Sequence, residues 1–287
     1  QAEDGIRDAL VGLVGSEMCI RDRDVVGSCR THRWVVSVSE TTKSRMRLAV
    51  VTGSARRIGA SIAETLHQKG CDVFLHYHQS SAEVDKLAAK LNAIRTDSAI
   101  TVQADLSNEE EIERMAGRVK ARNGQLDLLV NNASRFFPTV AGSTTKQEWD
   151  DLMDSNLRGP YFLTQALVSE LAAARGSVIN LLDVHAVRPM KDHGVYCMAK
   201  AGLQMMTLSL ARDLGPQIRV NGVAPGAILW PENDHAGEEQ ENILKKTVMG
   251  RAGTPGDIAS AVAYLGLDAP YVTGQVLAVD GGRSLNI

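Results

Sequence analysis

Hydrophobic residues gather into short runs along the chain, and each run is separated from the next by a longer amphipathic stretch. The short runs are rich in valine, leucine and isoleucine, which is typical of strands buried on both faces of a sheet. Seven strands are predicted, at Leu48–Thr52, Asp72–Tyr77, Ala99–Gln103, Leu126–Val130, Ser177–Leu182, Arg219–Val223 and Gln275–Val279. Helices are predicted between them, among others at Ile58–Lys69, Ala82–Ala93, Asn108–Arg122, Tyr161–Ala174 and Tyr196–Leu214. The alternation predicts a single doubly wound α/β domain over residues 46–287, with helices on both faces of a seven-stranded parallel sheet.

Residues 1–45 show neither the strand period nor the helix period, and their charges cancel, with seven Lys and Arg against seven Asp and Glu. The apolar stretch Ala9–Val14 is interrupted by Gly12 and preceded by acidic residues, unlike the core of a signal peptide. The strings EDGIRDA and LVGSEMCIRDR resemble translated sequencing adapter. We therefore expect Met46 to be the natural start and residues 1–45 to be a disordered or artefactual extension. The alternative is a genuine disordered N-terminus.

The composition restricts the class of protein. With 44% hydrophobic and 23% charged residues, the chain has the balance of an ordinary globular protein with a buried core. A formal net charge of −3 gives no basic excess for a nucleic acid or an anionic membrane surface. No apolar run approaches the length of a membrane span, and the four cysteines have neither metal-ligand spacing nor the number for a disulfide scaffold. We expect a cytoplasmic protein without a metal site, whose substrate is a small molecule.

A glycine-containing turn follows the first predicted strand, in the segment TGSARRIG at residues 52–59. Glycine lets the backbone approach a pyrophosphate, and the N-terminus of the next helix supplies free N–H groups and the positive end of its dipole. Such a turn alone is a weak signal, but its position after the first strand favours a Rossmann-type dinucleotide site. The residues predicted to bind the cofactor here are Gly53, Arg57, Ile58 and Gly59.

The end of the second predicted strand indicates which dinucleotide binds. An acidic residue at this position would bind the adenosine ribose of NAD, whereas this chain has His78, Gln79 and Ser80. These side chains, together with Arg56 or Arg57, offer the cations and hydroxyl donors that a 2′-phosphate requires. We therefore predict NADPH/NADP as the cofactor. The alternative is that the histidines here simply cover a strand end.

Two later segments are expected to border the same groove. Asp105 and Leu106 follow the third strand, where Asp105 can contact the adenine edge; capping the next helix is an equally good explanation for this aspartate. Asn132 and Ala133 close the fourth strand, where the strand order should reverse and where ligands bind in open α/β sheets. All four residues are predicted cofactor contacts.

The segment YCMAK at residues 196–200 carries the strongest chemical signal. Residues four apart lie on one face of a helix, so the Tyr196 phenol and the Lys200 ammonium point the same way. A nearby ammonium favours the ionised phenol and makes Tyr196 a better proton donor, and Lys200 could also hold the nicotinamide ribose. This spacing is common by chance, but here it follows the fifth strand and its loop, after the dinucleotide turn and the segment Asn131–Ala133.

Taken in order, these motifs resemble the short-chain dehydrogenase/reductase family over residues 46–287. The family usually has a serine thirteen residues before the tyrosine, where this chain has Asp183. A carboxylate cannot donate a hydrogen bond to a carbonyl oxygen, and its charge opposes ionisation of Tyr196. Asp183 therefore argues against simple carbonyl reduction and favours a substrate with ring nitrogens and an amino group. The alternative is an aspartate that only caps the loop after the fifth strand.

Within that family the chain resembles the pteridine reductases. Arg57 takes the place of the middle glycine of the usual turn, the spacing of Asp183, Tyr196 and Lys200 fits, and the strings LHYH, TVQADLSN and NNAS read closely like theirs. The resemblance implies a homotetramer. It also implies a set of site residues, with Arg57 at the cofactor phosphate and the pterin, Ser134, Phe136, Asp183 and Tyr196 against the pterin, Asn156 holding a proton-relay water, and Pro225 and Gly226 beside the nicotinamide.

The implied reaction is hydride transfer from NADPH to a C=N bond of a dihydropterin or pterin, with dihydromonapterin and dihydrofolate as neighbouring substrates. Asp183, Tyr196, Lys200 and Asn156 form the predicted catalytic set. Gln79 departs from the arginine of the trypanosomatid enzymes, and the substrate-lid stretch 229–246 also diverges. One alternative is a carbonyl reductase such as a 3-oxoacyl reductase, with Asp183 merely tolerated. Another, from a different class, is a non-catalytic NADP-sensing module, although its expected mark is a broken tyrosine–lysine pair.

Overall fold

The computed structural model describes residues 45–228 and 237–286. These residues form one seven-stranded sheet, with strands at Arg47–Val51 (β1), Cys71–Tyr77 (β2), Ala99–Gln103 (β3), Leu128–Asn131 (β4), Ser177–Leu181 (β5), Arg219–Pro225 (β6) and Val276–Val279 (β7). All neighbouring strands are parallel, and their order is β3-β2-β1-β4-β5-β6-β7. The predicted doubly wound sheet is confirmed, with every strand end within two residues of its expected position.

The helices that the structure describes lie between the strands in sequence. They are α1 (Arg57–Gln68), α2 (Ser81–Ile94), α3 (Glu109–Asn123), α4 (Lys146–Met153), α5 (Gly159–Ala166), α6 (Val168–Ala174), α7 (Gly194–Leu214), α8 (Glu238–Lys245) and α9 (Pro255–Ala263). The prediction of one continuous helix over Tyr161–Ala174 is wrong. Leu167, with φ −110° and ψ 6°, leaves the helical region and separates α5 from α6, and its side chain is fully buried in the core.

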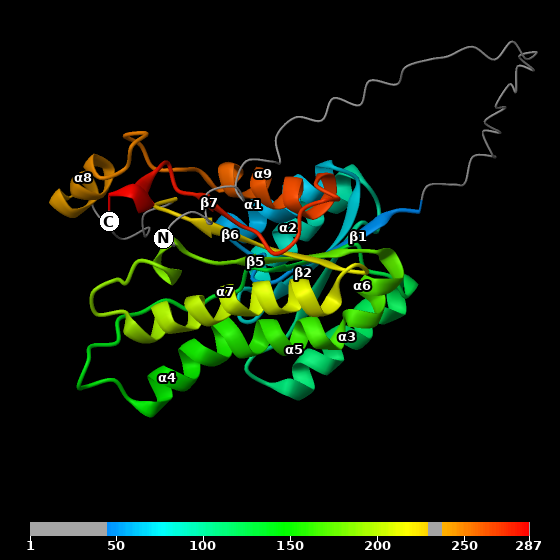
Figure 1. The fold of residues 1–287 in the computed structure, drawn as a ribbon. Helices are drawn as coiled ribbons and strands as arrows, with labels where there is room; N and C mark the ends of the chain where they lie inside the picture. Colours follow the sequence, from blue (N-terminus) through cyan, green and yellow to red (C-terminus); the bar gives the residue numbers. More distant parts are fainter. Residues whose placement is uncertain (1–44, 229–236, 287) are drawn as a thin grey trace, which may run out of the picture. The chain divides into compact units, whose positions relative to one another are not determined.

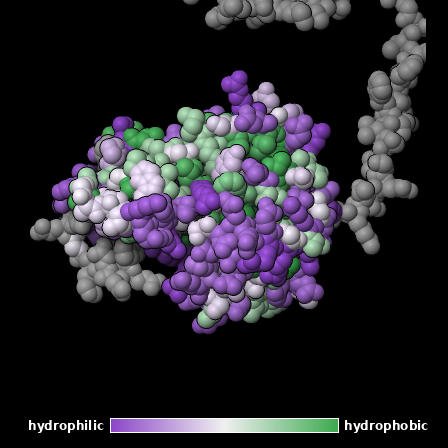
Figure 2. Space-filling model, turned by 90° about the horizontal axis from the view of Figure 1, so that it is seen from below, coloured by the Kyte–Doolittle hydropathy of each residue, from purple (hydrophilic) through white to green (hydrophobic). Residues whose placement is uncertain are grey.

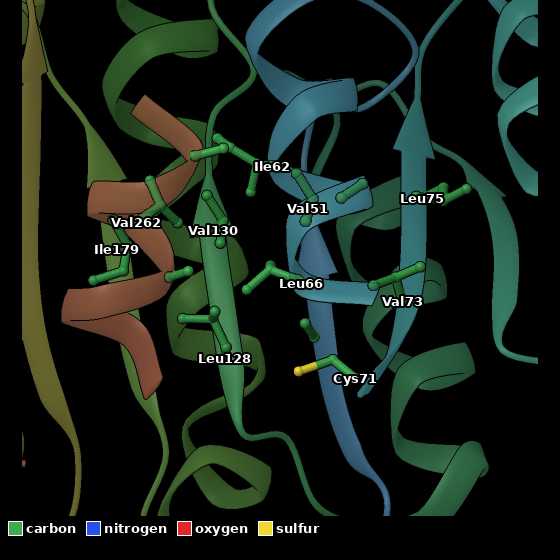
Figure 3. Close-up of a cluster of buried hydrophobic side chains, with 14 of the residues drawn as sticks. Val51, Ile62, Leu66, Cys71, Val73, Leu75, Leu128, Val130, Ile179 and Val262 are labelled. Atoms are coloured by element: carbon green, nitrogen blue, oxygen red, sulfur yellow. The ribbon is translucent and has the colours of Figure 1, made fainter. Parts of the chain in front are cut away.

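Side chains alternate along each strand and thereby build two cores. Ala49 and Val51 face a layer formed by α1, α2 and α9, whereas Leu48 and Val50 face a layer formed by α3, α5, α6 and α7. Figure 1 shows these two helical layers on opposite sides of the sheet. In Figure 3, Leu66 of α1 lies between strand residues such as Val130 and Val73 on the first of these faces. Since both faces are covered, the strands carry hydrophobic residues throughout.

The parallel arrangement brings the carboxyl ends of all seven strands to one edge of the sheet. The order reverses between β1 and its neighbour β4, which creates the switch point where ligands bind in such folds. The segments that carry the predicted site residues therefore meet there, although they are up to about 170 residues apart in sequence.

Two sequence interpretations fall wholly or partly outside the described residues. The first concerns residues 1–45, of which only Arg45 is described; its guanidinium pairs with Asp127 at 2.7 Å. The second concerns the substrate-lid stretch, of which residues 229–236 are not described. Among the helices that can be assessed, none is long and apolar enough to cross a membrane. The face seen in Figure 2 is largely hydrophilic, with hydrophobic side chains in smaller patches.

Candidate active site

The turn after β1 is held open by contacts with the end of β4. Gly53 has a φ of +61°, and a Cβ at this position would lie 2.9 Å from the Cα of Ala133. The Asn132 side-chain amide donates to the carbonyl oxygens of Thr52 and Gly53 at 2.8 and 3.0 Å. The Thr52 hydroxyl accepts from the backbone N–H groups of Asn132 and Ala133 at 2.8 and 2.9 Å. The two predicted cofactor motifs therefore form one rigid unit.

The next residues of this turn have different roles. Arg57 has a φ of +52°, the left-handed region that favours glycine, and it stands where the family pattern has glycine. The side chain of Ile58 packs against the core layer of α1 and α9. A Cβ on Gly59 would lie 2.2 Å from the Gly53 carbonyl oxygen, so only glycine lets α1 approach the turn this closely. Ile58 and Gly59 thus position the helix N-terminus.

His76, which sequence analysis did not assign to the site, braces the same turn. Its ring is 2% exposed; Nδ1 lies 3.1 Å from the Gly53 amide nitrogen and Nε2 lies 3.0 Å from the Ala104 carbonyl oxygen. Burial is the main cause that lowers the pKa of His76 to about 4, so the ring is neutral at physiological pH. A neutral ring satisfies both contacts only with its proton on Nε2. The sequence feature that could have indicated a buried role for His76 is its position two residues after Phe74, on the same face of the strand.

A cavity of about 390 Å³ lies at the switch point. Eight of the predicted cofactor residues line it, namely Gly53, His78, Gln79, Ser80, Asp105, Leu106, Asn132 and Ala133. Arg56 also lines the cavity, together with Ser134 and Arg135. The glycine cradle fits the pyrophosphate and adenosine part of a dinucleotide, and the end of β2 carries no acidic residue of the kind that binds the adenosine ribose of NAD. The residues present therefore fit a nicotinamide dinucleotide.

Sequence analysis offered two roles for Asp105, contact with the adenine and capping of the next helix. The second is wrong, because Asp105 does not cap α3. The N-cap of α3 is Asn108, whose side chain accepts from Glu110 and Glu111. The Asp105 carboxylate instead accepts from the backbone N–H and the hydroxyl of Ser107, at 2.9 and 2.7 Å, on the cavity wall.

Tyr196 and Lys200 lie one turn apart near the N-terminus of α7 and are 5% and 3% exposed. The Tyr196 hydroxyl donates to Asp183 Oδ2 at 2.8 Å. The other carboxylate oxygen, Oδ1, accepts from the His185 amide at 2.9 Å and caps the short helix Val184–Ala186. Asp183 therefore combines the loop-capping role with a direct bond to the phenol. These three side chains do not line the 390 Å³ cavity.

The electrostatics of this pair differ from the sequence expectation. Burial is the main cause that raises the pKa of the Tyr196 phenol, and the Asp183 carboxylate adds to the effect. The expected opposition of Asp183 to ionisation is present, and together with burial it outweighs the lowering expected from Lys200, so the net shift of the phenol pKa is upward. The Lys200 ammonium donates to the Leu181 carbonyl oxygen at 2.8 Å, and burial lowers its pKa to about 8 against the opposite effect of Asp183. At neutral pH the phenol therefore holds its proton.

Asn156 lies in a π-helical turn, Asp154–Arg158, of the kind often found at functional sites. The turn directs its buried amide towards the loop after β4. Its Oδ1 accepts from the Ser134 hydroxyl, and its Nδ2 donates to the carbonyl oxygens of Arg135 and Leu152 at 3.0 and 2.9 Å. In these contacts Asn156 orients the loop that carries Ser134, and its role as a holder of a relay water stays a prediction.

Phe136, which is exposed, and the half-buried His193 form an aromatic wall beside the phenol. Phe136 is 55% exposed, so it is not a core residue. Its ring meets Tyr196 edge-on, with centroids 4.9 Å apart, and stacks on His193 at 4.6 Å with an angle of 12° between the planes. Sequence analysis did not single out His193, because its contact with Phe136 depends on the fold. A flat heteroaromatic ring could bind against this wall.

Pro225 and Gly226 complete the same edge at the end of β6. The Gly226 amide donates to the Val279 carbonyl oxygen at 3.1 Å, and a Cβ on Gly226 would lie 2.7 Å from the Cα of Asp280. The turn therefore follows the adjacent strand closely. No cluster of three or more His, Cys, Asp or Glu side chains suited to a metal ion occurs among the residues that could be searched.

A glycine turn at a switch point, together with a buried tyrosine–lysine pair on the helix after β5, defines a nicotinamide-dependent oxidoreductase of the doubly wound α/β type. A family model described as enoyl-(acyl carrier protein) reductase matches residues 53–284. The chain belongs to the short-chain dehydrogenase/reductase family.

Relatives with two different substrates match the chain about equally well. It is 37% identical over 285 residues to pteridine reductase 1 of Leishmania tarentolae, with 85% of this chain and 99% of that protein covered. It is 36% identical over 238 residues to a 3-oxoacyl-(acyl-carrier-protein) reductase of Staphylococcus aureus, with 82% and 96% covered. The corresponding reductase of Staphylococcus epidermidis is 33% identical over 238 residues, with 82% and 97% covered. Identity alone does not separate pterin from 3-oxoacyl substrates.

Proposed function

We propose that this protein is an NADPH-dependent pteridine reductase. The observation that carries the proposal is the 2.8 Å hydrogen bond from the Tyr196 hydroxyl to Asp183 Oδ2, at the position where the family usually has serine. A carbonyl substrate needs a hydroxyl donor at position 183. A pterin instead offers amino and ring N–H groups, from which a carboxylate can accept hydrogen bonds. Similarity to a pteridine reductase over 85% of the chain supports the same substrate class.

The residues would share the chemistry as follows. When bound, NADPH supplies the hydride that adds to the carbon of the pterin C=N bond. The adjacent nitrogen gains a proton from the Tyr196 phenol, whose raised pKa keeps it protonated until transfer. For this transfer the phenol must exchange its bond to Asp183 for one to the ring nitrogen, and the freed carboxylate oxygen then accepts from a substrate N–H group. The Lys200 ammonium, buried beneath, stabilises the phenolate that remains until it is reprotonated.

The wall of Phe136 and His193 supports a planar substrate. Stacking on Phe136 would hold a pterin flat beside the Tyr196 hydroxyl. Ser134 and Arg57 are proposed to contact the same ring, Ser134 because its hydroxyl is held by Asn156 at the cavity edge. Dihydropterin is the proposed substrate, and dihydrofolate and dihydromonapterin have the same reacting bond.

The second candidate is a short-chain carbonyl reductase, such as a 3-oxoacyl reductase. One observation favours it: Asp183 Oδ1 caps the helix Val184–Ala186, which would explain an aspartate without any role in the reaction. The 36% identity to a 3-oxoacyl reductase agrees with this candidate. A non-catalytic NADP-sensing module is less well supported, because the Tyr196–Lys200 pair is intact and buried.

A substrate panel tests the proposal. The full chain is assayed for NADPH consumption with dihydropterins, dihydrofolate, a 3-oxoacyl thioester and simple ketones. A kcat/KM for a dihydropterin well above that for every carbonyl substrate is expected. The reverse order would establish the carbonyl reductase, and turnover of neither class would support the sensing module.

Assembly and location are further parts of the proposal. We propose a homotetramer, supported by the exposed Met198, Met205 and Leu208 along α7, since exposed apolar side chains on one helix often mark a subunit interface. Light scattering of the full chain would measure this. A cytoplasmic location is proposed from the free thiols of Cys71 and Cys197.

A further inference from the structure

Both arginines that line the cofactor cavity are paired with an acidic residue. Arg56 contacts the Glu83 carboxylate, and Arg135 Nη1 lies 2.7 Å from Asp151 Oδ1. A site for a 2′-phosphate must offer positive charge that is not already neutralised. The two pairs therefore bear on how strongly this cavity distinguishes NADPH from NADH.

The pair of Arg56 and Glu83 differs from the pair of Arg135 and Asp151. Asp151 lines the cavity itself, whereas Glu83 does not, although its partner Arg56 does. Arg56 precedes α1 and Glu83 lies in the first turn of α2. Because β1 and β2 are neighbours in the sheet, the two segments that follow them lie side by side. The Glu83 carboxylate therefore binds Arg56 from outside the cavity.

The two side chains are accessible to water and to ligand. The exposed fractions of the Arg56 and Glu83 side chains are 57% and 37%. Hydrogen bonds from its own backbone amide and from Arg56 lower the pKa of Glu83, so the carboxylate is ionised at neutral pH. A carboxylate and a phosphate both bind a guanidinium through oxygen atoms, and they compete for the same N–H donors.

We propose that Glu83 occupies on Arg56 the place that the 2′-phosphate of the cofactor takes on binding, and that this competition limits the preference for NADPH over NADH. The inference rests on the proposed use of NADP(H). When the phosphate binds, Arg56 either leaves Glu83 or holds two anions close together. In both cases Glu83 weakens binding of the 2′-phosphate and leaves binding of the remaining adenosine monophosphate unchanged.

Two small ligands isolate this effect without turnover. The dissociation constants of 2′,5′-ADP and 5′-AMP are measured by titration calorimetry on the full chain, for the wild type and for Glu83→Gln. The variant should bind 2′,5′-ADP about three- to fivefold more tightly, which is the upper range for the loss of an exposed ion pair. Its affinity for 5′-AMP should not change. High salt should reduce the difference, because exposed charges are screened.

Glu64→Gln is the matched control. Glu64 of α1 pairs with Lys90 of α2 at 2.7 Å, so this variant removes the same charge from the same two helices, away from the cavity lining. Neither ligand should bind it differently. Arg56→Gln should lose most of the preference for 2′,5′-ADP, and adding Glu83→Gln to that variant should have no effect.

The outcomes separate the two proposals. A wild type that prefers 2′,5′-ADP, with a Glu83→Gln variant that is unchanged, would overturn the inference and leave the cofactor assignment intact. A weaker affinity of Glu83→Gln for 2′,5′-ADP would also overturn it, because Glu83 would then position Arg56 for the phosphate. A wild type without any preference would contradict the NADP(H) assignment. In that case the inference about Glu83 holds if Glu83→Gln binds 2′,5′-ADP more tightly than 5′-AMP, and it is overturned if this variant shows no such preference.

Discussion

The hydroxyl of Tyr196 donates a hydrogen bond to the Asp183 carboxylate at 2.8 Å, and the same carboxylate caps the short helix that follows β5. Local structure and proposed chemistry thus depend on one side chain. The two roles of Asp183 can be tested separately. The cap needs only an acceptor for the His185 amide, whereas the proposed reaction also needs an acceptor for a substrate N–H group.

Replacing Asp183 by serine should separate pterin from ketone reduction. We expect kcat/KM for a dihydropterin to fall by on the order of 10²-fold, since the charged acceptor for the substrate N–H groups is lost. A serine still caps the helix and restores the hydroxyl donor, so any ketone reduction should persist or rise. The ratio of the two rates in one preparation cancels folding losses. An unchanged pterin rate would mean that Asp183 serves only as a loop cap. Tyr196→Phe is the comparison variant, and it should impair both pterin and ketone reduction.

Removing the side chain of Arg57 should stabilise the fold while impairing the site. Arg57 holds a φ of +52°, and relief of a left-handed conformation by glycine is worth about 1 kcal/mol in unfolding free energy. Arg57→Gly should therefore raise Tm, while the KM values for NADPH and pterin increase. Arg175→Gly is the control: Arg175 has a φ of +50° after α6, before β5 begins and away from the site. It should raise Tm without changing either KM. Unchanged KM values in both variants would remove Arg57 from the site.

Stability should rise between about pH 4 and pH 6.5 because of His76. The pKa of His76 is about 4 in the folded protein against 6.5 as the ordinary value, so in this range the unfolded chain binds a proton that the folded protein does not. The unfolding free energy then increases with pH across the interval, by roughly 3 kcal/mol at most. Below about pH 4 both states are protonated and the dependence ends.

Urea unfolding at several pH values measures this dependence. His76→Asn keeps an acceptor for the Gly53 amide and cannot titrate, so its pH slope should be shallower than that of the wild type. The buried His67, whose pKa is also lowered, contributes equally to both proteins and cancels in the difference. Equal slopes would contradict the assignment to His76.

Activity should decline above about pH 8 as Lys200 loses its proton. The pKa of this buried ammonium is about 8, and neutral lysine no longer stabilises the phenolate of Tyr196. The value of kcat/KM for NADPH reports ionisations of the free enzyme and should show this alkaline limb. Lys200→Arg, which stays charged, should have lower activity but no decline of kcat/KM near pH 8. A decline near pH 8 that persists in Lys200→Arg would have to be assigned to another titrating group.

Local patterns in the sequence determined the sheet and the approximate site. Continuous hydrophobic runs separated by amphipathic stretches predicted the ends of seven strands within two residues, because strands with both faces covered are hydrophobic throughout. The order of motifs placed the glycine turn and Asn132 at the switch point, and helical spacing put Tyr196 and Lys200 on one face. These features depend on residues close in sequence or on the topology that parallel strands impose.

Contacts between distant segments were decided only by the tertiary structure. His76 joins Gly53 and Ala104, Glu83 neutralises Arg56, and Phe136 stacks on His193, over separations of 23 to 57 residues. The raised pKa of Tyr196 likewise follows from burial and from the Asp183 carboxylate, and it overrode the expectation based on the nearby lysine. Such contacts depend on which side chains share a desolvated space once the strands are paired. A single sequence specifies them only through the complete fold.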